Sequence, residues 1–412
     1  MKNISSCRLC HSTSIEALWQ LRECPYGDLF KNSQSEATEV PSHPIALARC
    51  SDCGLIQLEE ITDIKGQYDN YIYQTKVTKG LNEFYQNIAK RVTAENFPTG
   101  HVPSFVLDIG SNDGSFLEIF KEYGLKVLGV EPSLEASRQA NKNGIPTIRK
   151  YFDLDSVDEI IKLHGTPGLI SINYTLANVP DIKDFMENVV KLMNEASILS
   201  IVTGYHPDQF AVNMFDYIGH DHLTYLSLTD FSNIADAHGL TILDANRYEH
   251  KGGSLHVTLI KKNPNLELSP TPNVIQLLQR EQWLGVDHPW YYSKLAERID
   301  EAQAELVGYL RENAIDKIPG IGASISTTYL MNQFQISEYI SNLFDDDNLK
   351  HGKFSPLFAK KVLPLSSIVD ASEKVVMILA WQHTSRILKR LQDLGFKGKV
   401  IVPLPRLTVV EI

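Results

Sequence analysis

One stretch of this 412-residue chain decides its fold: Ser104-Phe-Val-Leu-Asp-Ile-Gly-Ser-Asn-Asp-Gly-Ser115. The apolar residues 105–107 predict a buried strand, the two-glycine segment 108–114 predicts a loop, and a helix is expected to begin at Ser115. In a doubly wound α/β sheet, such a strand–loop–helix unit is where a nucleotide cofactor binds. The stretch therefore predicts both a fold class and the place of a cofactor.

The same alternation continues along the chain after this unit. Helices are expected between the earlier strands, and the strands are expected at residues 126–131, 145–148, 168–172, 197–202, 240–248 and 254–261. Strands that alternate with helices form a parallel sheet covered on both faces. We therefore expect an α/β, Rossmann-like domain over residues 101–263.

Three further regions flank this domain. Residues 1–60 hold all five cysteines and are expected to form a zinc-binding module. Residues 61–100 are expected to be a helical connector, because apolar residues recur there at helical spacing. Residues 264–412 begin with a proline-bearing linker and a long helical stretch. They end in a strand–helix–strand unit, which predicts a second Rossmann-like α/β domain without a G-x-G-x-x-G loop.

The composition narrows the possible partners. The chain carries 39 Lys and Arg against 50 Asp and Glu, a formal net charge of −11, and 43% of its residues are hydrophobic. This balance is that of a globular protein, and the negative charge argues against nucleic acid or an anionic membrane surface as a partner. No apolar run reaches the ~18–20 residues that span a bilayer, and the first residues lack a signal peptide's apolar core. A cytoplasmic protein with reduced thiols is expected.

The cysteines form two closely spaced pairs, Cys7-x2-Cys10 and Cys50-x2-Cys53. Four thiolates suit tetrahedral Zn²⁺, and four protein ligands fill its coordination shell, so we expect a structural zinc site. A redox C-x-x-C pair or incidental thiols are the alternatives. Cys24 has no partner at ligand spacing and is expected to be a buried thiol.

Polar residues at the ends of the first two strands favour S-adenosylmethionine (SAM) as the cofactor. The glycine loop lacks the third glycine of the dinucleotide fingerprint, which weakens an assignment to NAD. Glu131 can accept hydrogen bonds from both ribose hydroxyls, and the charge of Asp108 favours the cationic methionine part of SAM. A plain tight turn is the alternative for the loop alone. The expected cofactor contacts are Asp108, Gly110, Asn112, Gly114, Glu131 and Asn173.

Three histidines, His206, His220 and His222, follow the strand at 197–202 within 17 residues. This order places them on loops at the carboxyl edge of the sheet, beside the cofactor. A general base is the favoured function, because histidine titrates near neutral pH. A metal site and ordinary surface or hydrogen-bonded histidines are the alternatives.

The order of features along almost the whole chain resembles one family. The features are the two C-x2-C pairs, a tyrosine-rich segment, D-I-G-S-N-D-G-S, G-V-E-P-S, an H-D-H-L turn and a G-G-S strand. Together they resemble the SAM-dependent C-methyltransferases of deoxysugar biosynthesis, which act on nucleotide-linked 4-keto-6-deoxyhexoses. The resemblance implies a zinc module, a SAM domain and a C-terminal α/β domain.

The resemblance also implies a mechanism. A base removes the proton on a carbon next to the ketone, and the resulting enolate attacks the SAM methyl group in line. By resemblance the base is His222, and Asp221, where the family commonly has Glu, would orient the imidazole or help to bind the sugar. The tyrosine that matches the family's catalytic one is Tyr73.

The departures from the family's pattern lie on the substrate side. The family usually has His at Asn178, Tyr at Gly219 and His at Lys251, and it has a lysine near Ser326. The zinc and SAM motifs are kept, so we expect the family's methyl donor with a changed acceptor. The expected acceptor contacts are His220, Asn178, Lys251 and Gly253.

The sequence is compatible with three hypotheses about function. The leading one is a SAM-dependent C-methyltransferase acting on a nucleotide-linked keto-deoxysugar, with a small-molecule acceptor as its partner. The second is a SAM enzyme for another small acceptor, in which oxygen, nitrogen or a non-sugar carbon is methylated. The third is a zinc-stapled binding protein with a vestigial SAM site.

Overall fold

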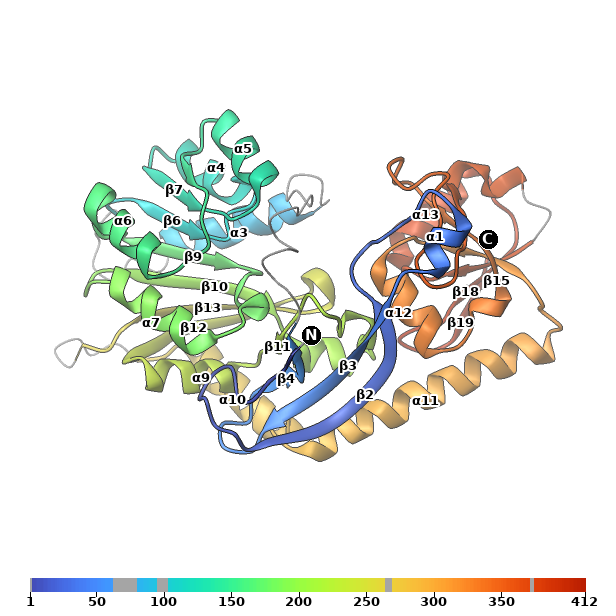
Figure 1. Ribbon diagram of the computed structural model, residues 1–412, viewed down its shortest axis with the longest axis horizontal. Helices are drawn as coiled ribbons and strands as arrows, with labels where there is room; N and C mark the ends of the chain where they lie inside the picture. Colours follow the sequence, from blue (N-terminus) through green and yellow to red (C-terminus); the bar gives the residue numbers. More distant parts are fainter. Residues whose placement is uncertain (1, 62–79, 95–102, 264–268, 371–373) are drawn as a thin grey trace.

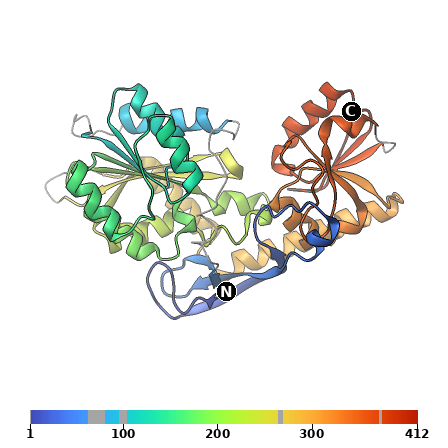
Figure 2. The same ribbon diagram turned by 45° about the horizontal axis from the view of Figure 1, so that its top comes forward.

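The computed structural model describes residues 2–61, 80–94, 103–263, 269–370 and 374–412. Two α/β domains lie side by side, and a long N-terminal arm and one long helix run beneath both (Figure 1). Figure 2 shows the arm continuing from the first domain to the second along one side of the molecule. No helix of the described residues is long and apolar enough to cross a membrane.

The first domain is built on a seven-stranded sheet with strand order β12-β13-β10-β9-β6-β7-β8. Five strands are parallel, while β13 pairs antiparallel with both β10 and β12. The turn between β12 and β13 is short, and strands joined by a short turn must run antiparallel. The bounds are β6 (Val106–Ile109), β7 (Val127–Val130), β8 (Thr147–Ile148), β9 (Leu169–Asn173), β10 (Ile198–Gly204), β12 (Leu240–Tyr248) and β13 (Ser254–Lys261).

Helices cover both faces of this sheet, as the alternation of strands and helices predicts. One face packs on α3 (Leu81–Ala94), α4 (Ser115–Glu122) and part of α5 (Leu134–Lys142). The other face packs on α6 (Leu154–His164), α7 (Ile182–Leu192), α9 (Leu228–Ala237) and α10 (Pro272–Leu284). Phe84, Ile88 and Val92, which recur at helical spacing in the expected helical connector, are buried together on α3. The Rossmann-like fold class is confirmed.

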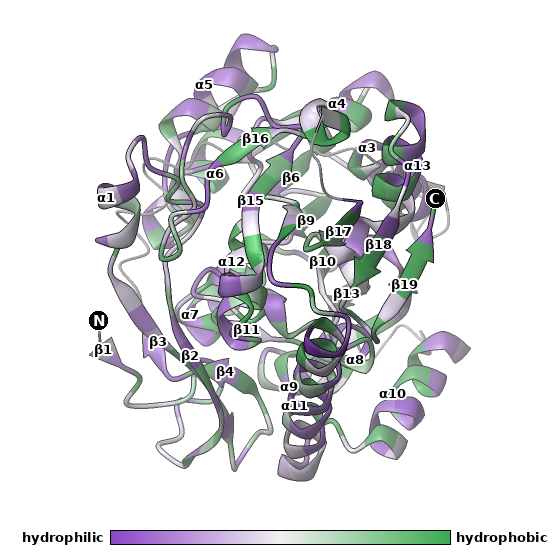
Figure 3. Cartoon of the chain, turned by 90° about the vertical axis from the view of Figure 1, so that its right-hand side faces the viewer, coloured by the Kyte–Doolittle hydropathy of each residue, from purple (hydrophilic) through white to green (hydrophobic). Residues whose placement is uncertain are grey.

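The second domain has a six-stranded sheet with strand order β16-β15-β14-β17-β18-β19. Only β19 runs antiparallel, and Figure 3 shows that β17 and β18 are hydrophobic strands in the interior of the sheet. The bounds are β14 (Ile318–Ile321), α12 (Ile325–Gln333), β15 (Ile340–Asp345), β16 (Val362–Pro364), β17 (Val375–Ile378), α13 (Thr384–Leu394), β18 (Lys399–Val402) and β19 (Thr408–Glu411).

The N-terminal module is a small antiparallel sheet with strand order β11-β4-β3-β2, and β1 (Lys2–Asn3) pairs with β5 (Glu60–Ile61). Strands β2 (Ile15–Pro25) and β3 (Ser42–Cys50) form the arm, whose tip carries α1 (Gln34–Thr38). The tip reaches the second domain, where Lys31 bridges to Phe354. Strand β4 (Ile56–Leu58) pairs with β11 (Thr224–Tyr225), which belongs to the first domain in sequence. The module thus contacts both domains.

Helix α11 (Pro289–Glu312) runs beside β2 and links the domains from below (Figure 1). A direct link between the domains is made by Asp216, a buried carboxylate in the short 3₁₀ turn η3 (Phe215–Tyr217). It accepts hydrogen bonds from Trp381 Nε1 at 3.0 Å and Gln382 Nε2 at 2.6 Å, both from the second domain. A buried carboxylate with two such donors fixes the orientation of one domain against the other.

Glu281 joins α10 to the start of α9 and to Tyr205, the residue after β10. Its fully buried carboxylate accepts hydrogen bonds from the backbone N–H groups of Leu228 and Thr229, which are otherwise unsatisfied at the start of α9. It also accepts from the hydroxyls of Thr229 and Tyr205, each at 2.7 Å. One side chain therefore satisfies four donors.

We predict that Glu281→Ala lowers the free energy of unfolding by ~3 kcal/mol or more, because it leaves buried donors unpaired. Denaturant unfolding followed by tryptophan fluorescence and circular dichroism measures the change. Glu297→Ala, at an exposed position of α11, is the control and should change stability by no more than ~0.5 kcal/mol. Equal stability of the two variants would contradict the prediction.

Candidate functional site

The four cysteines of the two C-x2-C pairs come together in one cluster. Their sulfur atoms lie within 4.8 Å of one another, with Cys7 Sγ 3.6 Å from Cys53 Sγ and Cys10 Sγ 3.5 Å from Cys50 Sγ. Tetrahedral zinc with Zn–S bonds of ~2.3 Å separates its sulfurs by ~3.8 Å. The donor set and its spacing therefore fit a structural zinc ion. The fifth cysteine, Cys24, is buried in the apolar core, and burial raises the pKa of its thiol.

Arg8, between the first two zinc cysteines, attaches the cluster to its surroundings. Its guanidinium donates to the backbone oxygen of Leu58 in β4 at 2.6 Å and to that of Glu60 in β5 at 3.0 Å. Its own carbonyl oxygen accepts from Ile182 N at the start of α7. The metal module is thus hydrogen-bonded to the first domain.

The glycine loop after β6 has the geometry of a tight cradle. Gly110 and Gly114 have φ values of 75° and 79°, in the left-handed region that favours glycine. A Cβ atom on Gly110 would lie 2.2 Å from Thr175 Oγ1, so no side chain fits there without displacing its neighbour. Asn112 also has a positive φ, of 49°, and its backbone N–H points to Glu131.

Two carboxylates stand at the carboxyl edge of the sheet, beside this loop. Asp108 Oδ1 accepts from Ser171 Oγ at 2.6 Å and Asn173 Nδ2 at 3.1 Å. Burial raises the pKa of Asp108 to about 7, and these two hydrogen bonds act in the opposite direction. Glu131 accepts from the backbone N–H groups of Asn112 at 2.9 Å and Ser133 at 2.8 Å, while burial raises its pKa.

These residues fit SAM. Asp108, Asn173 and Glu131 come from three neighbouring strands, as the sequence order predicts. The side-chain oxygen of Asn173 and the hydroxyl of Ser111 are buried there without a hydrogen-bond partner in the described structure. Carboxylate oxygens have further lone pairs for ligand hydroxyls, so the edge offers both acceptors and negative charge.

The turn that bears His222 is held between the first domain and the zinc module. Its backbone closes with a bond from His222 N to Gly219 O at 3.0 Å. The next residue, Leu223, donates to Ala177 O at 2.8 Å and accepts from Leu58 N at 2.9 Å. Because Leu58 is the last residue of β4, the zinc module fixes the position of this turn.

The imidazole of His222 lines a small cavity of about 20 Å³, which has room for roughly one water molecule. His222 is half-buried as a residue, and its ring stacks on that of Tyr217, with ring centroids 4.2 Å apart. Tyr174 lines the same cavity and directly follows Asn173 of the cofactor edge. Burial, together with the charge of Lys251, lowers the pKa of His222 to about 4, so the imidazole is neutral near pH 7 and can accept a proton.

The other two histidines of the group are buried and hydrogen-bonded, and His206 lines the same cavity as His222. His220 is buried, with Nε2 3.0 Å from Pro44 O and Nδ1 3.3 Å from Tyr329 Oη. His206 is buried with Nε2 3.1 Å from Tyr292 Oη. Within the described part of the chain, the only cluster that could hold a metal is the four-cysteine one. A metal site on the H-D-H turn therefore gains no support.

The other residues predicted for the site lie in different surroundings. Asp221 is partly exposed beside His222, and Tyr73 lies outside the described residues. Asn178 ends the 3₁₀ turn η2 (Leu176–Asn178), and its side-chain oxygen is buried without a hydrogen-bond partner in the described structure. Gly253 has φ 139°, and a Cβ there would lie 2.7 Å from Asp208 Cβ. No side chain therefore fits at Gly253 without displacing Asp208.

Two aromatic residues of the site have no signal in the sequence. Tyr174 follows a strand without any motif, and only its position after Asn173 marks it. Tyr329 comes from α12 of the second domain and fills the space beside Gly219, where a Cβ would lie 2.5 Å from the Tyr329 ring. A contact between domains that are distant in sequence leaves no local pattern.

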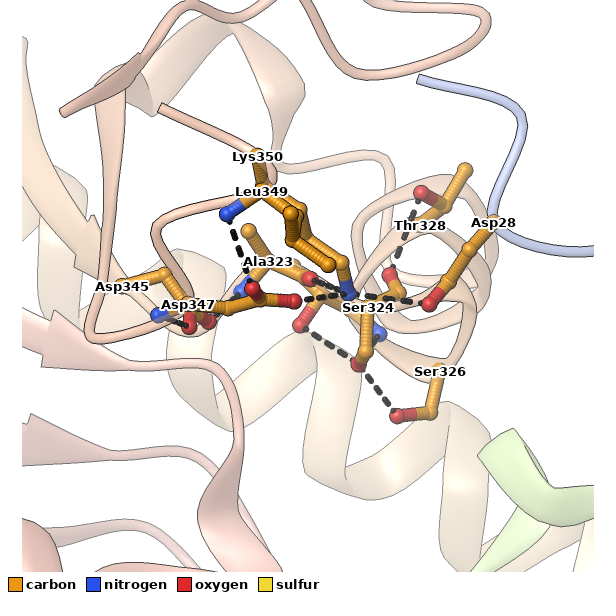
Figure 4. Close-up of polar contacts among 10 residues, drawn as sticks. Asp28, Ala323, Ser324, Ser326, Thr328, Asp345, Asp347, Leu349 and Lys350 are labelled. Carbon is orange, nitrogen blue, oxygen red and sulfur yellow. Dashed lines mark hydrogen bonds and ion pairs between the residues drawn. The ribbon is translucent and has the colours of Figure 1, made fainter. Parts of the chain in front are cut away.

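In the second domain, the loop of residues 322–324 between β14 and α12 takes part in a separate polar cluster (Figure 4). Lys350 Nζ lies 2.7 Å from Ala323 O and 2.9 Å from Asp28 Oδ2 of the arm. Asp345 Oδ2 accepts from Ala323 N at 2.7 Å. Lys350, from another part of the chain, therefore stands at this loop, although the lysine that the resemblance expects near Ser326 is absent.

Three family models match successive parts of the chain. A zinc-binding domain matches residues 7–68, a methyltransferase domain matches residues 81–245, and a C-methyltransferase C-terminal domain matches residues 249–405. The C-methyltransferase NovU of Streptomyces niveus is 25% identical over 419 residues, which cover 100% of this chain and 98% of NovU. These matches support SAM-dependent C-methylation.

Two solved structures align with 44% of the chain. One is magnesium protoporphyrin IX methyltransferase from Synechocystis PCC 6803 with bound SAM, at 13% identity and a TM-score of 0.33, of which 79% is covered. The other is a SAM-dependent methyltransferase from Clostridium acetobutylicum ATCC 824, at 10% identity and a TM-score of 0.35, of which 92% is covered.

For the metal, we predict one Zn²⁺ per chain and a loss of zinc in Cys50→Ser, with a less stable N-terminal module, because folding and metal binding are coupled. Metal analysis of protein purified without chelator measures the zinc content. Cys24→Ala is the control and should keep the full zinc content. Wild-type protein without zinc would contradict the assignment.

For the cofactor, we predict that Glu131→Ala weakens SAM binding tenfold or more, because a hydrogen bond to a charged group contributes roughly 1.5–3 kcal/mol. Isothermal titration calorimetry gives the dissociation constant. Glu135→Ala, at an exposed position of α5, should bind SAM like the wild type. An unchanged dissociation constant for Glu131→Ala would show that the ribose is held elsewhere.

Proposed function

We propose, on the premise that the chain is a SAM-dependent methyltransferase with a structural zinc module, that it methylates a carbon next to the ketone of a nucleotide-linked keto-deoxysugar. The observation that carries the proposal is the position of His222. A neutral imidazole lines a cavity that also contacts Tyr174, next to the cofactor edge. A base beside a methyl-donor site is what carbon methylation requires.

The chain's own residues divide the work between two sides of the site. Asp108, Asn173 and Glu131 would hold SAM, and bound SAM would supply an electrophilic methyl group. On the acceptor side, His222 removes the proton from the carbon next to the ketone. The electron pair of that C–H bond then forms the enolate, whose carbon becomes the nucleophile. Holding both reactants at one edge turns a bimolecular step into an effectively unimolecular one.

The acceptor class rests on two kinds of support. The match to a C-methyltransferase C-terminal domain and the full-length relative favour a carbon acceptor. The motif order along the chain favours a nucleotide-linked keto-sugar. Asn178 and Gly219, where the resembling family has larger or charged side chains, favour an acceptor that differs from that family's in shape.

A panel of nucleotide-linked keto-sugars, incubated with SAM and analysed by mass spectrometry, tests the acceptor. We expect a mass gain of one methyl group on a carbon. Methylation of oxygen or nitrogen, or of a non-sugar compound only, would replace the proposal with the second hypothesis. Absence of SAM binding at millimolar concentration would leave a binding protein.

For the base, we predict that His222→Asn keeps the SAM affinity but slows methyl transfer by ~10²–10⁴-fold, the range for a positioned general base. Single-turnover kinetics measure the transfer step. His164→Asn, at an exposed position at the end of α6, should react like the wild type. Methyl transfer by His222→Asn at the wild-type rate would remove His222 from the mechanism.

A further inference from the structure

Lys251 stands in an unusual backbone position beside the cavity. It lies in the 3₁₀ turn η4 (His250–Gly252) between β12 and β13, with φ 52° and ψ 37°. A residue other than glycine rarely adopts this left-handed backbone conformation, and residues in this conformation cluster at functional sites. Two hydrogen bonds hold the turn: Gln209 Nε2 donates to Lys251 O at 3.3 Å, and Ser254 Oγ donates to His250 O at 2.8 Å.

The ammonium group of Lys251 points to an aromatic ring rather than to a carboxylate. Nζ lies 3.9 Å from the ring centroid of Tyr174, whose hydroxyl is 2.7 Å from Ser254 Oγ. In the described part of the chain, no Asp or Glu lies within ion-pair distance of Lys251, whereas Lys150, Lys262, Lys294 and Lys350 each pair with one. A cation at this place is attracted by the ring and remains available to an anion.

The ammonium group lies close to the proposed base. Burial lowers the pKa of His222 and of His250, and the charge of Lys251 lowers both further, so both imidazoles lie within its electric field. Burial lowers the pKa of Lys251 itself to about 8, so the group is mostly protonated near pH 7. Tyr174 and Gln209, which contact Lys251, also line the cavity with His222. Through Tyr174 and Gln209, the cation therefore adjoins the cavity that His222 lines.

We infer that the ammonium group of Lys251 binds the carbonyl oxygen of the acceptor and stabilises the oxyanion that forms when His222 removes the neighbouring proton. This inference rests on the proposed function. The proton moves from carbon to the imidazole, the C–H electron pair forms the carbon–carbon double bond, and the carbonyl π pair moves to oxygen. The new negative charge faces the ammonium group in a site with little water, where such stabilisation is strongest.

The pair of Lys251 and His222 is coupled in a useful direction. The free ammonium group holds the basicity of His222 down. When the oxyanion develops against the ammonium group, its field at the imidazole is offset, and the imidazole becomes a stronger base as it takes the proton. The same residue thus stabilises the product of proton transfer and promotes the transfer.

The pH dependence separates this role from a covalent one. The titratable groups that interact with Lys251 are Tyr174, whose ring its ammonium group contacts, and His222 and His250, on which its charge acts. Tyr217 stacks on His222, and the charge of His383 of the second domain also acts on His250. If the ammonium form is required, kcat/KM rises as His222 loses its proton near pH 4 and falls as Lys251 loses its own near pH 8. An amine that forms an imine with the ketone would instead give activity that rises through pH 8.

The test compares Lys251→Met with Lys251→Arg in the full-length protein. We expect Lys251→Met to lose ~10²–10³-fold in kcat/KM at unchanged SAM affinity, the usual effect of removing one oxyanion donor. Lys251→Arg keeps the charge, so it should recover part of the activity and lose the fall near pH 8. Lys262→Met, at an exposed ion pair, is the control and should behave like the wild type.

A second readout needs no acceptor. The imidazole pKa of His222, followed by nuclear magnetic resonance, should rise in Lys251→Met and stay low in Lys251→Arg. An unchanged pKa, or full activity of Lys251→Met while His222→Asn is inactive, would overturn the inference and leave the proposed function intact. Trapping of a lysine–acceptor adduct by borohydride would also overturn it, in favour of the imine. Full activity of His222→Asn would instead count against the proposed function.

Discussion

The pairing of β4 with β11 is the contact on which the site depends. β4 follows the second zinc knuckle, and β11 follows the turn that carries His222. A few backbone hydrogen bonds therefore connect a four-thiolate cluster to the proposed base. The cofactor edge is fixed separately, by the parallel strands of the first domain. The zinc module accordingly sets where the base stands relative to the methyl donor, although none of its cysteines reaches the reacting atoms.

The site places charges of opposite sign on its two sides. Two buried carboxylates stand on the cofactor side, Asp108 for the cationic methionine part of SAM and Glu131 for its ribose. The ammonium group of Lys251 faces the region where an oxyanion would form. Burying unpaired charge costs folding free energy, so each group is held by neighbours: backbone N–H groups for Glu131, and an aromatic ring for Lys251. A preorganised field of this kind stabilises charge that exists only during the reaction.

Local patterns in the sequence predicted the fold class, the cysteine cluster and the strand ends that carry Asp108 and Glu131, because each depends on spacing within a short segment. The arm of β2 and β3 was not predictable, since it reaches the second domain, which is distant in sequence, and neither was the pairing of β4 with β11. The contacts of Tyr329 with Gly219 and of Asp216 with Trp381 also join segments that are distant in sequence, so no local pattern predicted them. Of the three histidines, spacing did not separate His222 from the hydrogen-bonded His206 and His220. Tyr73 lies outside the described residues, and its role stays a prediction.

Removal of a carbon-bound proton is the central claim of this account, and hydrogen exchange tests it without methyl transfer. The protein would be incubated in deuterium oxide with S-adenosylhomocysteine and a keto-sugar nucleotide that it methylates, and the recovered sugar analysed by nuclear magnetic resonance. Deuterium is expected at the carbon next to the ketone, at a rate that depends on the protein. Recovered sugar that keeps its original hydrogen there, together with a methyl group found on oxygen or nitrogen in the SAM reaction, would contradict it.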